Sequence, residues 1–143
     1  MSMHRFLEGH ASEFMTKNVK TVPAGLTVRE LGALFDKNDF NSFPVIENGR
    51  VIGLVTKLDF LKAFLFNTSH LVPHYNEIME RPVRDVMTKD VINIAPETPL
   101  THVLDLMVKL RTRGLPVVDS DGVLQGVISR TDLMHALSAA TKK

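Results

Sequence analysis

The chain contains an internal repeat, and no other feature of the sequence restricts its fold as strongly. Residues 15–19, MTKNV, match residues 87–91, MTKDV, at a shift of 72 positions. After one inserted residue in the second copy the shift becomes 73, so that GLVTKLDF at 53–60 aligns with GVISRTDL at 126–133. A solenoid needs at least three repeats, so two copies predict a pseudo-symmetric pair.

The first copy has the pattern of a β-α-β-β-α unit. A short β-type run at 19–22 precedes Thr27, which is a good helix N-cap with Glu30 three residues later, the arrangement of a capping box. The dipeptide Asn48-Gly49 between two aliphatic runs is a strong signal for a β-hairpin. Thr56 then opens a last helix, KLDFLKAFLF.

The second copy repeats this order of elements. VINI at 91–94 is the first β-type run, Thr98 is expected to cap the next helix with Pro99 in its first turn, and Ser129 opens the last helix. Because a three-stranded sheet with one apolar face is not stable alone, we predict an α/β fold of the α+β type. Its two tandem β-α-β-β-α units would pack sheet to sheet with pseudo-twofold symmetry.

The repeat also predicts the domain organisation. We expect an N-terminal arm at 1–13, a first repeat at 14–66, a connector at 67–82, a second repeat at 83–140 and a tail at 141–143.

Composition excludes several classes of protein. The chain has 143 residues, of which 44% are hydrophobic, enough to bury a core, and its net charge of +1 argues against a broad polyanion-binding face. The absence of cysteine excludes disulfides, thiolate catalysis and cysteine-based zinc sites. No run is long enough for a membrane span and the N-terminus lacks the apolar core of a signal peptide, so we expect a soluble cytoplasmic protein.

The sequence gives little sign of catalysis, metal binding or nucleic-acid binding. His70 and His74 have the spacing of a helical metal pair, but Pro73 lies between them, so we expect no metal site. No nucleophile with a matching base, P-loop or GxGxxG motif is present, and we expect no enzyme activity. No helix rich in Arg and Lys is present, and RTR at 111–113 is only a weak signal for RNA or DNA contact.

The closing motif, G-h-h-[TS]-x-x-D with h an aliphatic residue, has two interpretations. A structural one is that Thr56 with Asp59, and Ser129 with Asp132, only cap a helix, and that the glycine allows close packing of strands. A functional one is that the helix N-terminus and the hydroxyl bind a phosphate, while the carboxylate accepts hydrogen bonds from two ribose hydroxyls.

The order of elements, the MTxxV openings, the PV pairs at 44–45 and 116–117 and the two closing motifs together resemble the tandem CBS domain pair, or Bateman module. The resemblance covers residues 14–137. It implies two units related by pseudo-twofold symmetry, with clefts that hold adenosine ligands. With the neighbouring basic residues, the candidates for ribose and phosphate binding are Thr56, Lys57, Asp59, Arg113, Ser129, Arg130 and Asp132. The adenine slot implied by the resemblance lies near Lys20, Phe43, Pro44, Ile92, Leu115 and Pro116.

The two candidate sites differ in charge. The second copy carries LRTRGLP at 110–116 and Arg130, whereas the first carries DFNSFP at 39–44 and only Lys57. Because phosphate binding requires positive charge, we predict that the second site binds a phosphorylated adenosine better. The alternative is that these arginines only solvate a loop. Phe43 is also a candidate to fill the first slot itself.

These observations favour a regulatory module that senses an adenosine nucleotide of the AMP, ADP or ATP type and signals to a partner protein by a conformational shift. No cofactor is expected beyond this ligand. One alternative is a ligand-free module for dimerisation or protein interaction, with self-filled clefts, and another is an S-adenosylmethionine or NAD-type ligand. The resemblance also implies a homodimer, and the helices expected at Thr27–Lys37 and Leu58–Phe66 have enough apolar residues for one.

Overall fold

The computed structural model describes residue 6, residues 8–65 and residues 75–141, and divides into two compact units. The middle unit is Lys20–Val91, and the terminal unit combines residues up to Val19 with residues from Ile92 onward. The units therefore differ from the sequence repeats, because the MT pair that opens each repeat lies in the unit that contains the hairpin of the other repeat. Each unit contains helices and a small sheet, which confirms the predicted α+β class.

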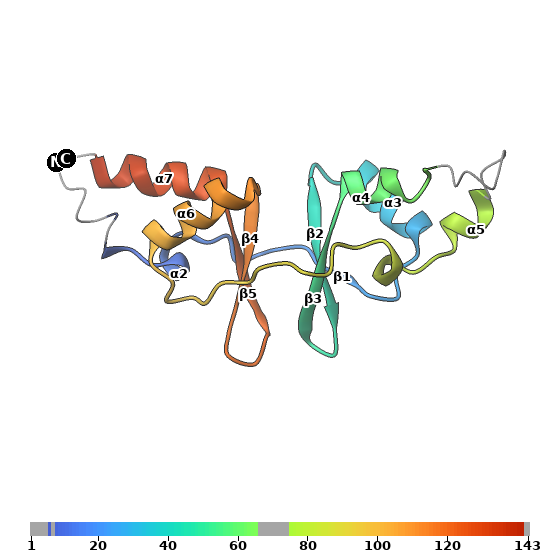
Figure 1. Ribbon diagram of the computed structural model, residues 1–143, viewed down its shortest axis with the longest axis horizontal. Coiled ribbons are helices and arrows are strands. Elements are labelled where there is room, and N and C mark those ends of the chain that lie inside the picture. Colours follow the sequence, from blue (N-terminus) through green and yellow to red (C-terminus); the bar gives the residue numbers. More distant parts are fainter. Residues whose placement is uncertain (1–5, 7, 66–74, 142–143) are drawn as a thin grey trace. The chain divides into compact units, whose positions relative to one another are not determined.

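The middle unit contains a three-stranded sheet in the order β1-β2-β3. Strand β1 runs parallel to β2, and β2 runs antiparallel to β3. Helices α3 and α4 lie on one face of this sheet (Figure 1). The elements are β1 (Val22–Pro23), α3 (Val28–Lys37), β2 (Ser42–Glu47), β3 (Arg50–Thr56), α4 (Lys57–Lys62), α5 (Tyr75–Met79) and the 3-10 helix η1 (Val83–Asp85).

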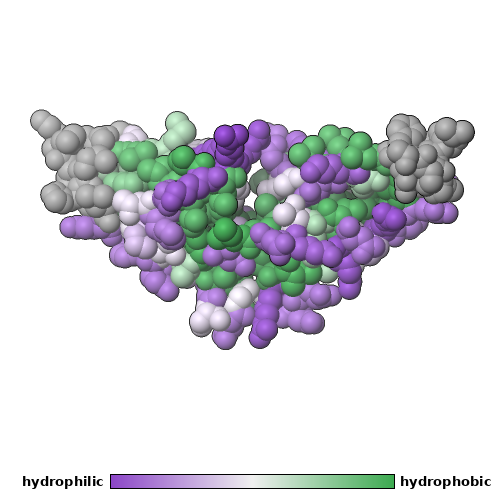
Figure 2. Space-filling view, viewed as in Figure 1, coloured by the Kyte–Doolittle hydropathy of each residue, from purple (hydrophilic) through white to green (hydrophobic). Residues whose placement is uncertain are grey.

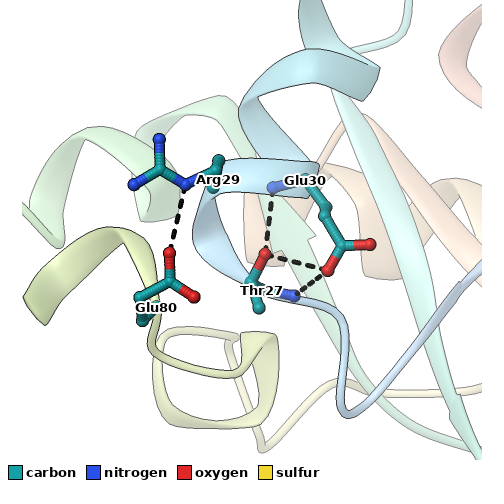
Figure 3. Close-up of polar contacts among 4 residues, drawn as sticks. All are labelled: Thr27, Arg29, Glu30 and Glu80. Atoms are coloured by element: carbon teal, nitrogen blue, oxygen red, sulfur yellow. Dashed lines mark hydrogen bonds and ion pairs between the residues drawn. The ribbon is translucent and has the colours of Figure 1, made fainter. Parts of the chain in front are cut away.

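Helix α3 begins with the predicted capping box (Figure 3). The Glu30 N–H donates to Thr27 Oγ1 at 3.1 Å, and the Thr27 N–H donates to Glu30 Oε1 at 3.2 Å. These bonds satisfy backbone donors that have no partner inside the helix. An ion pair between Arg29 and Glu80, 3.1 Å long, joins the same turn of α3 to the residue that follows α5.

The hairpin between β2 and β3 turns at Asn48 and Gly49, as predicted. Their φ angles are 52° and 77°, and a two-residue type I′ turn requires positive φ at both positions. The core beneath the sheet is mainly aliphatic but contains the fully buried Phe43, whose ring centroid lies 5.0 Å from that of Phe35 and 5.8 Å from that of Phe40.

The terminal unit contains a two-stranded antiparallel sheet with helices α6 and α7 on one face (Figure 1). Its elements are α2 (Ala11–Phe14), α6 (Leu100–Leu110), β4 (Gly114–Val118), β5 (Leu124–Ser129) and α7 (Arg130–Thr141). Its core is mainly aliphatic, with Leu100, Val103, Val117 and Ile128 fully buried.

Two local predictions for this unit are wrong. VINI does not form a strand; Ile94 makes a single parallel bridge to Val117. Helix α6 begins at Leu100 with Pro99 as its N-cap, one residue later than expected. The Thr98 hydroxyl accepts a hydrogen bond from the Ala95 N–H at 3.0 Å, so it is used in the preceding turn instead of in the helix cap.

Residues before the first repeat form part of the terminal unit. Phe6 and Ala11 are 3% and 0% exposed and belong to its hydrophobic core. His10 forms an antiparallel bridge to Pro99, and the Ala11 N–H donates to the Thr98 carbonyl at 2.9 Å. Apolar burial and backbone pairing therefore hold this segment against the start of α6.

Residues 66–74, which comprise the last residue of the expected first repeat and the first part of the expected connector, lie outside the described residues, and so do His70 and His74. Among the residues that are described, no group of three or more His, Cys, Asp or Glu side chains is placed to hold a metal ion. Within the same part of the chain, every helix is too short or too polar to cross a membrane.

Candidate functional site

The closing motif of each repeat forms a capping box around an aspartate. In the middle unit the Asp59 N–H donates to Thr56 Oγ1 at 3.0 Å, and the Thr56 N–H donates to Asp59 Oδ2 at 3.0 Å. In the terminal unit the Asp132 N–H donates to Ser129 Oγ at 3.1 Å, and the Ser129 N–H donates to Asp132 Oδ2 at 2.8 Å. The capping interpretation is therefore confirmed in both units, and each carboxylate keeps acceptor capacity on its outer oxygen.

Each aspartate also accepts a hydrogen bond from a threonine that the sequence analysis missed. Thr88 Oγ1 lies 3.3 Å from Asp59 Oδ1 and 3.2 Å from its Oδ2. Thr16 Oγ1 lies 3.2 Å from Asp132 Oδ1 and 3.3 Å from its Oδ2. The signal in the sequence is the MT pair that opens both repeats, because the same threonine recurs at the same place in each.

Backbone pairing holds each threonine beside the strand that leads into the aspartate. The Thr88 N–H donates to the Leu54 carbonyl at 2.8 Å, and the Leu54 N–H donates to the Thr88 carbonyl at 3.0 Å. Thr16 and Val127 make the same two bonds, at 2.8 and 3.0 Å. Thr88 thus pairs with β3 and Thr16 with β5, and these exchanged contacts place a hydroxyl at each carboxylate.

The glycine of the closing motif lies under this pairing. A Cβ atom on Gly53 would lie 2.7 Å from the Thr88 carbonyl oxygen and 2.7 Å from Met87 Sδ. On Gly126 it would lie 2.6 Å from the Thr16 carbonyl oxygen. Real Cβ atoms do not approach backbone oxygens so closely, which confirms that the glycine permits close packing of two backbones.

The two aspartates differ in burial. Asp59 is 9% exposed, whereas Asp132 is half-buried. A buried carboxylate is stable only when it is well hydrogen-bonded. The bonds from Thr56 and Thr88 supply part of that requirement for Asp59.

The loop before β4 concentrates positive charge beside the second aspartate. The Arg130 side chain donates from Nε to the Thr112 carbonyl at 3.1 Å and from Nη2 to the Arg111 carbonyl at 3.3 Å. Its backbone N–H donates to the Arg113 carbonyl at 3.0 Å. Arg130 therefore braces the loop, while the side chain of Arg113 is exposed.

The middle unit keeps only the backbone part of this arrangement. The Lys57 N–H donates to the Asn41 carbonyl at 3.1 Å, and the Lys57 side chain is exposed. Asp39 in the same loop lowers the local positive charge. The loop of the middle unit therefore carries less positive charge than that of the terminal unit.

The residues expected to line an adenine slot are either buried or exposed to solvent. The side chains of Phe43 and Leu115 belong to the hydrophobic cores, so only their backbone atoms are available to line a slot. Lys20 and Ile92 are exposed, each two residues before the position that pairs with β2 or β4. The middle unit contains Lys20, Phe43, Pro44, Thr56, Lys57 and Asp59, and the terminal unit contains Ile92, Arg113, Leu115, Pro116, Ser129, Arg130 and Asp132.

Comparison with known proteins identifies the same two repeats. The family model described as the CBS domain matches residues 11–66 and 83–139. An uncharacterised 17.7 kDa protein of Acidianus ambivalens is 32% identical over 88% of this chain and 71% of its own length. An uncharacterised protein of Methanocaldococcus jannaschii is 33% identical over 87% of this chain, which spans 43% of that relative.

Solved structures share the fold. The crystal structure of CBSX2 in complex with AMP has a TM-score of 0.78 and 24% identity, over 93% of this chain and 98% of that one. The CBS domain pair of protein MJ0100, in complex with 5′-methylthioadenosine and S-adenosyl-L-methionine, has a TM-score of 0.72 and 21% identity over 92% and 97% of the two chains. Two tandem matches to one family model, over most of the sequence, show that this chain belongs to the CBS domain family.

Proposed function

We propose that this chain is a regulatory module that binds an adenosine nucleotide of the AMP, ADP or ATP type and signals to a partner protein. The observation that supports this most directly is the position of Asp132, at the first turn of α7 and beside a loop that carries Arg111 and Arg113. A carboxylate accepts hydrogen bonds from the neutral ribose diol of a nucleotide, and the neighbouring guanidinium groups and helix N-terminus attract its phosphate.

The geometry favours the terminal unit as the stronger site. Helix α7 has 12 residues, whereas α4 has only 6, so α7 presents more aligned peptide dipoles at its N-terminus. Asp132 is half-buried and Asp59 is buried. Arg113 is free to turn toward a phosphate because the loop is already braced by Arg130.

The comparisons support this choice of ligand class. CBSX2 has been crystallised with AMP, and the MJ0100 domain pair with 5′-methylthioadenosine and S-adenosyl-L-methionine. All three ligands contain adenosine, and they differ in what the 5′ carbon carries. An arginine-rich loop beside the site favours a phosphate at that position over a sulfonium, because guanidinium attracts an anion and repels a cation.

The signal would pass through a change in the relative stability of two arrangements of the chain. A ligand shifts such an equilibrium only by its difference in affinity for the two states. We propose that the partner protein recognises the nucleotide-bound arrangement, and that the chain acts as a homodimer. The apolar surface around α4 supports the homodimer, because Leu58 and Leu61 are 59% and 62% exposed and Figure 2 shows hydrophobic residues there.

A second candidate function is a ligand-free interaction module. It is favoured by the hydrogen bonds that Thr56 and Thr88 already make to Asp59, which use part of the acceptor capacity of the carboxylate without any ligand. In this case the exposed leucines around α4 would be the functional surface, and added nucleotide would have no effect.

Thermal unfolding with added ligand separates the two. Binding to the folded state alone raises its stability by about 2.7 kcal/mol when the ligand is at one hundred times its Kd. We expect AMP, ADP or ATP at millimolar concentration to raise Tm by several degrees, with smaller shifts for S-adenosylmethionine and NAD. Identical melting curves with every ligand, together with no heat in calorimetric titration, would leave the interaction module as the function.

A further inference from the structure

We propose that Thr88 and Thr16 compete with the ribose of the ligand for the carboxylates of Asp59 and Asp132, and that a bound ligand displaces them. This inference rests on the proposed function, because it concerns the same two carboxylates. It gives the MT pair at the opening of each repeat a role in regulating the site.

The threonine hydroxyl lies where a ribose diol would bind. Thr88 Oγ1 is 3.3 Å from Asp59 Oδ1 and 3.2 Å from Oδ2. An atom at nearly equal distances from both oxygens lies close to the bisector of the carboxylate. A vicinal diol that donates one hydrogen bond to each oxygen approaches along the same bisector, so the two occupants exclude each other.

The remaining acceptor capacity of Asp59 leads to the same conclusion. Each carboxylate oxygen has about two lone-pair sites. Oδ2 already accepts from the Thr56 N–H at 3.0 Å and from the Thr88 hydroxyl. The Thr56 N–H is fixed at the start of α4, whereas the Thr88 side chain can rotate about χ1. A ribose hydroxyl at Oδ2 therefore requires Thr88 to leave.

The bond that would be lost is weak. Hydrogen bonds from a hydroxyl to a carboxylate are usually about 2.5 to 2.7 Å long. The contacts at Asp59 and Asp132 are 3.2 to 3.3 Å long, and each threonine shares one proton between two oxygens. Two well-formed bonds from a diol would replace one poorly formed bond, so the exchange favours the ligand.

The threonines also lie where the chain passes from one unit to the other. Thr16 precedes the crossing at Val19 and Lys20, and Thr88 precedes the crossing at Val91 and Ile92. Each is paired through its backbone to the strand that carries the closing motif of its unit. Displacing the hydroxyl therefore removes a side-chain bond that ties this segment to the carboxylate, close to the point where the chain passes between the units.

Removing the hydroxyl tests this competition. We expect Thr16→Val to raise the affinity for AMP in the terminal unit by about two- to tenfold, the range that corresponds to the net value of one hydrogen bond. Thr88→Val should do the same for any binding at Asp59. The variants Thr16→Ser and Thr88→Ser keep a hydroxyl and should bind as the wild type does. Thr101→Val, an exposed threonine on α6, controls for the substitution itself.

A second ligand locates the effect at the ribose. AMP that lacks both the 2′ and 3′ hydroxyls cannot replace the threonine, so its affinity should be equal in the wild type and the valine variants. Calorimetric titration measures both ligands. If Thr16→Val does not fold, Thr16→Ala removes the same hydroxyl without adding a methyl group to the packing.

The outcomes separate this inference from the function on which it rests. If the wild type binds AMP but the affinity of both valine variants is unchanged or lower, the competition is wrong and the nucleotide site stands. If the dideoxy compound gains as much affinity as AMP, the threonines act through stability instead of through the ribose. If the wild type binds no adenosine ligand, the proposed function and the competition are overturned together.

Discussion

The two units differ in the residue that precedes the Pro-Val pair of each repeat. In the middle unit this residue is Phe43, whose ring packs against two other phenylalanine rings. In the terminal unit it is Leu115, which lies in a mainly aliphatic core. The middle unit has a first strand, β1, that pairs with β2, whereas at the corresponding position of the terminal unit Ile94 forms only a single bridge to Val117. The loops carry opposite charge, with Asp39 in one and Arg111 and Arg113 in the other.

Around each aspartate the two units form the same set of hydrogen bonds. A hydroxyl and its N–H close a capping box, a threonine from a distant segment reaches the carboxylate, and a glycine allows that segment to approach. The polar arrangement has thus been kept while the packing around it diverged. The same hydrogen bonds therefore form around each aspartate although the neighbouring packing, the burial of the carboxylate and the charge of the loop differ.

Adding a methyl group to the shared glycine should have the largest effect. We expect Gly53→Ala and Gly126→Ala each to lower the free energy of unfolding by about 1–3 kcal/mol, because the new Cβ would overlap a backbone oxygen. Urea unfolding measures the change. Gly25→Ala is the control, since its Cβ would meet only the end of the Arg84 side chain, at 3.7 Å. Similar losses in the two units would support the comparison, and a loss in only one would break it.

The arginine-rich loop should separate the units in ligand affinity. We expect Arg113→Ala to weaken AMP binding about tenfold, the value of roughly one charge-assisted hydrogen bond. Lys57→Ala should change it less than about threefold, because Lys57 lies in the middle unit, whereas the stronger site is proposed in the terminal unit. Calorimetric titration gives both values. A larger loss for Lys57→Ala or Asp59→Ala than for Arg113→Ala would mean that the order of the two sites is reversed.

The N-caps of α3 and α6, the helices that precede the two hairpins, should differ in their contribution to stability. Thr27→Ala should cost about 1 kcal/mol, because it removes the side-chain partner of the Glu30 N–H at the start of α3. Helix α6 has Pro99 at the corresponding position and no side-chain cap. Thr101→Ala, in the first turn of α6, is therefore a matched control in the other unit, and thermal unfolding should show almost no change. An equal loss for both would indicate a general effect of the substitution.

Surface ion pairs should have the smallest effect. The pair between Arg29 and Glu80 is 3.1 Å long, but the side chains are 54% and 64% exposed. We expect a double-mutant cycle with Arg29→Ala and Glu80→Ala to give a coupling energy below about 1 kcal/mol, and lower still in 1 M salt. The local pair between Lys109 and Asp105 on α6 should give about 0.3 to 0.5 kcal/mol. A coupling above 2 kcal/mol would show that α3 depends on the segment after α5 far more than solvent exposure suggests.

Features that depend on neighbouring residues were determined by the sequence itself. The capping box at Thr27, the turn at Asn48 and Gly49, and the helix openings at Thr56 and Ser129 all formed as predicted. In each case the interacting groups lie within three residues of each other, so the same short stretch carries both partners. The internal repeat extended these local patterns into the correct fold class.

Features that depend on distant partners were decided only by the tertiary structure. Thr88 lies 29 residues from Asp59, and Thr16 lies 116 residues from Asp132, so no local pattern links them. The exchange of the MT segments between repeats, the burial of Asp59 and the loss of a strand at VINI likewise follow from which backbone lies beside which. Hydrogen bonding and close approach between remote segments are properties of the folded chain, because only packing brings their atoms within bonding distance.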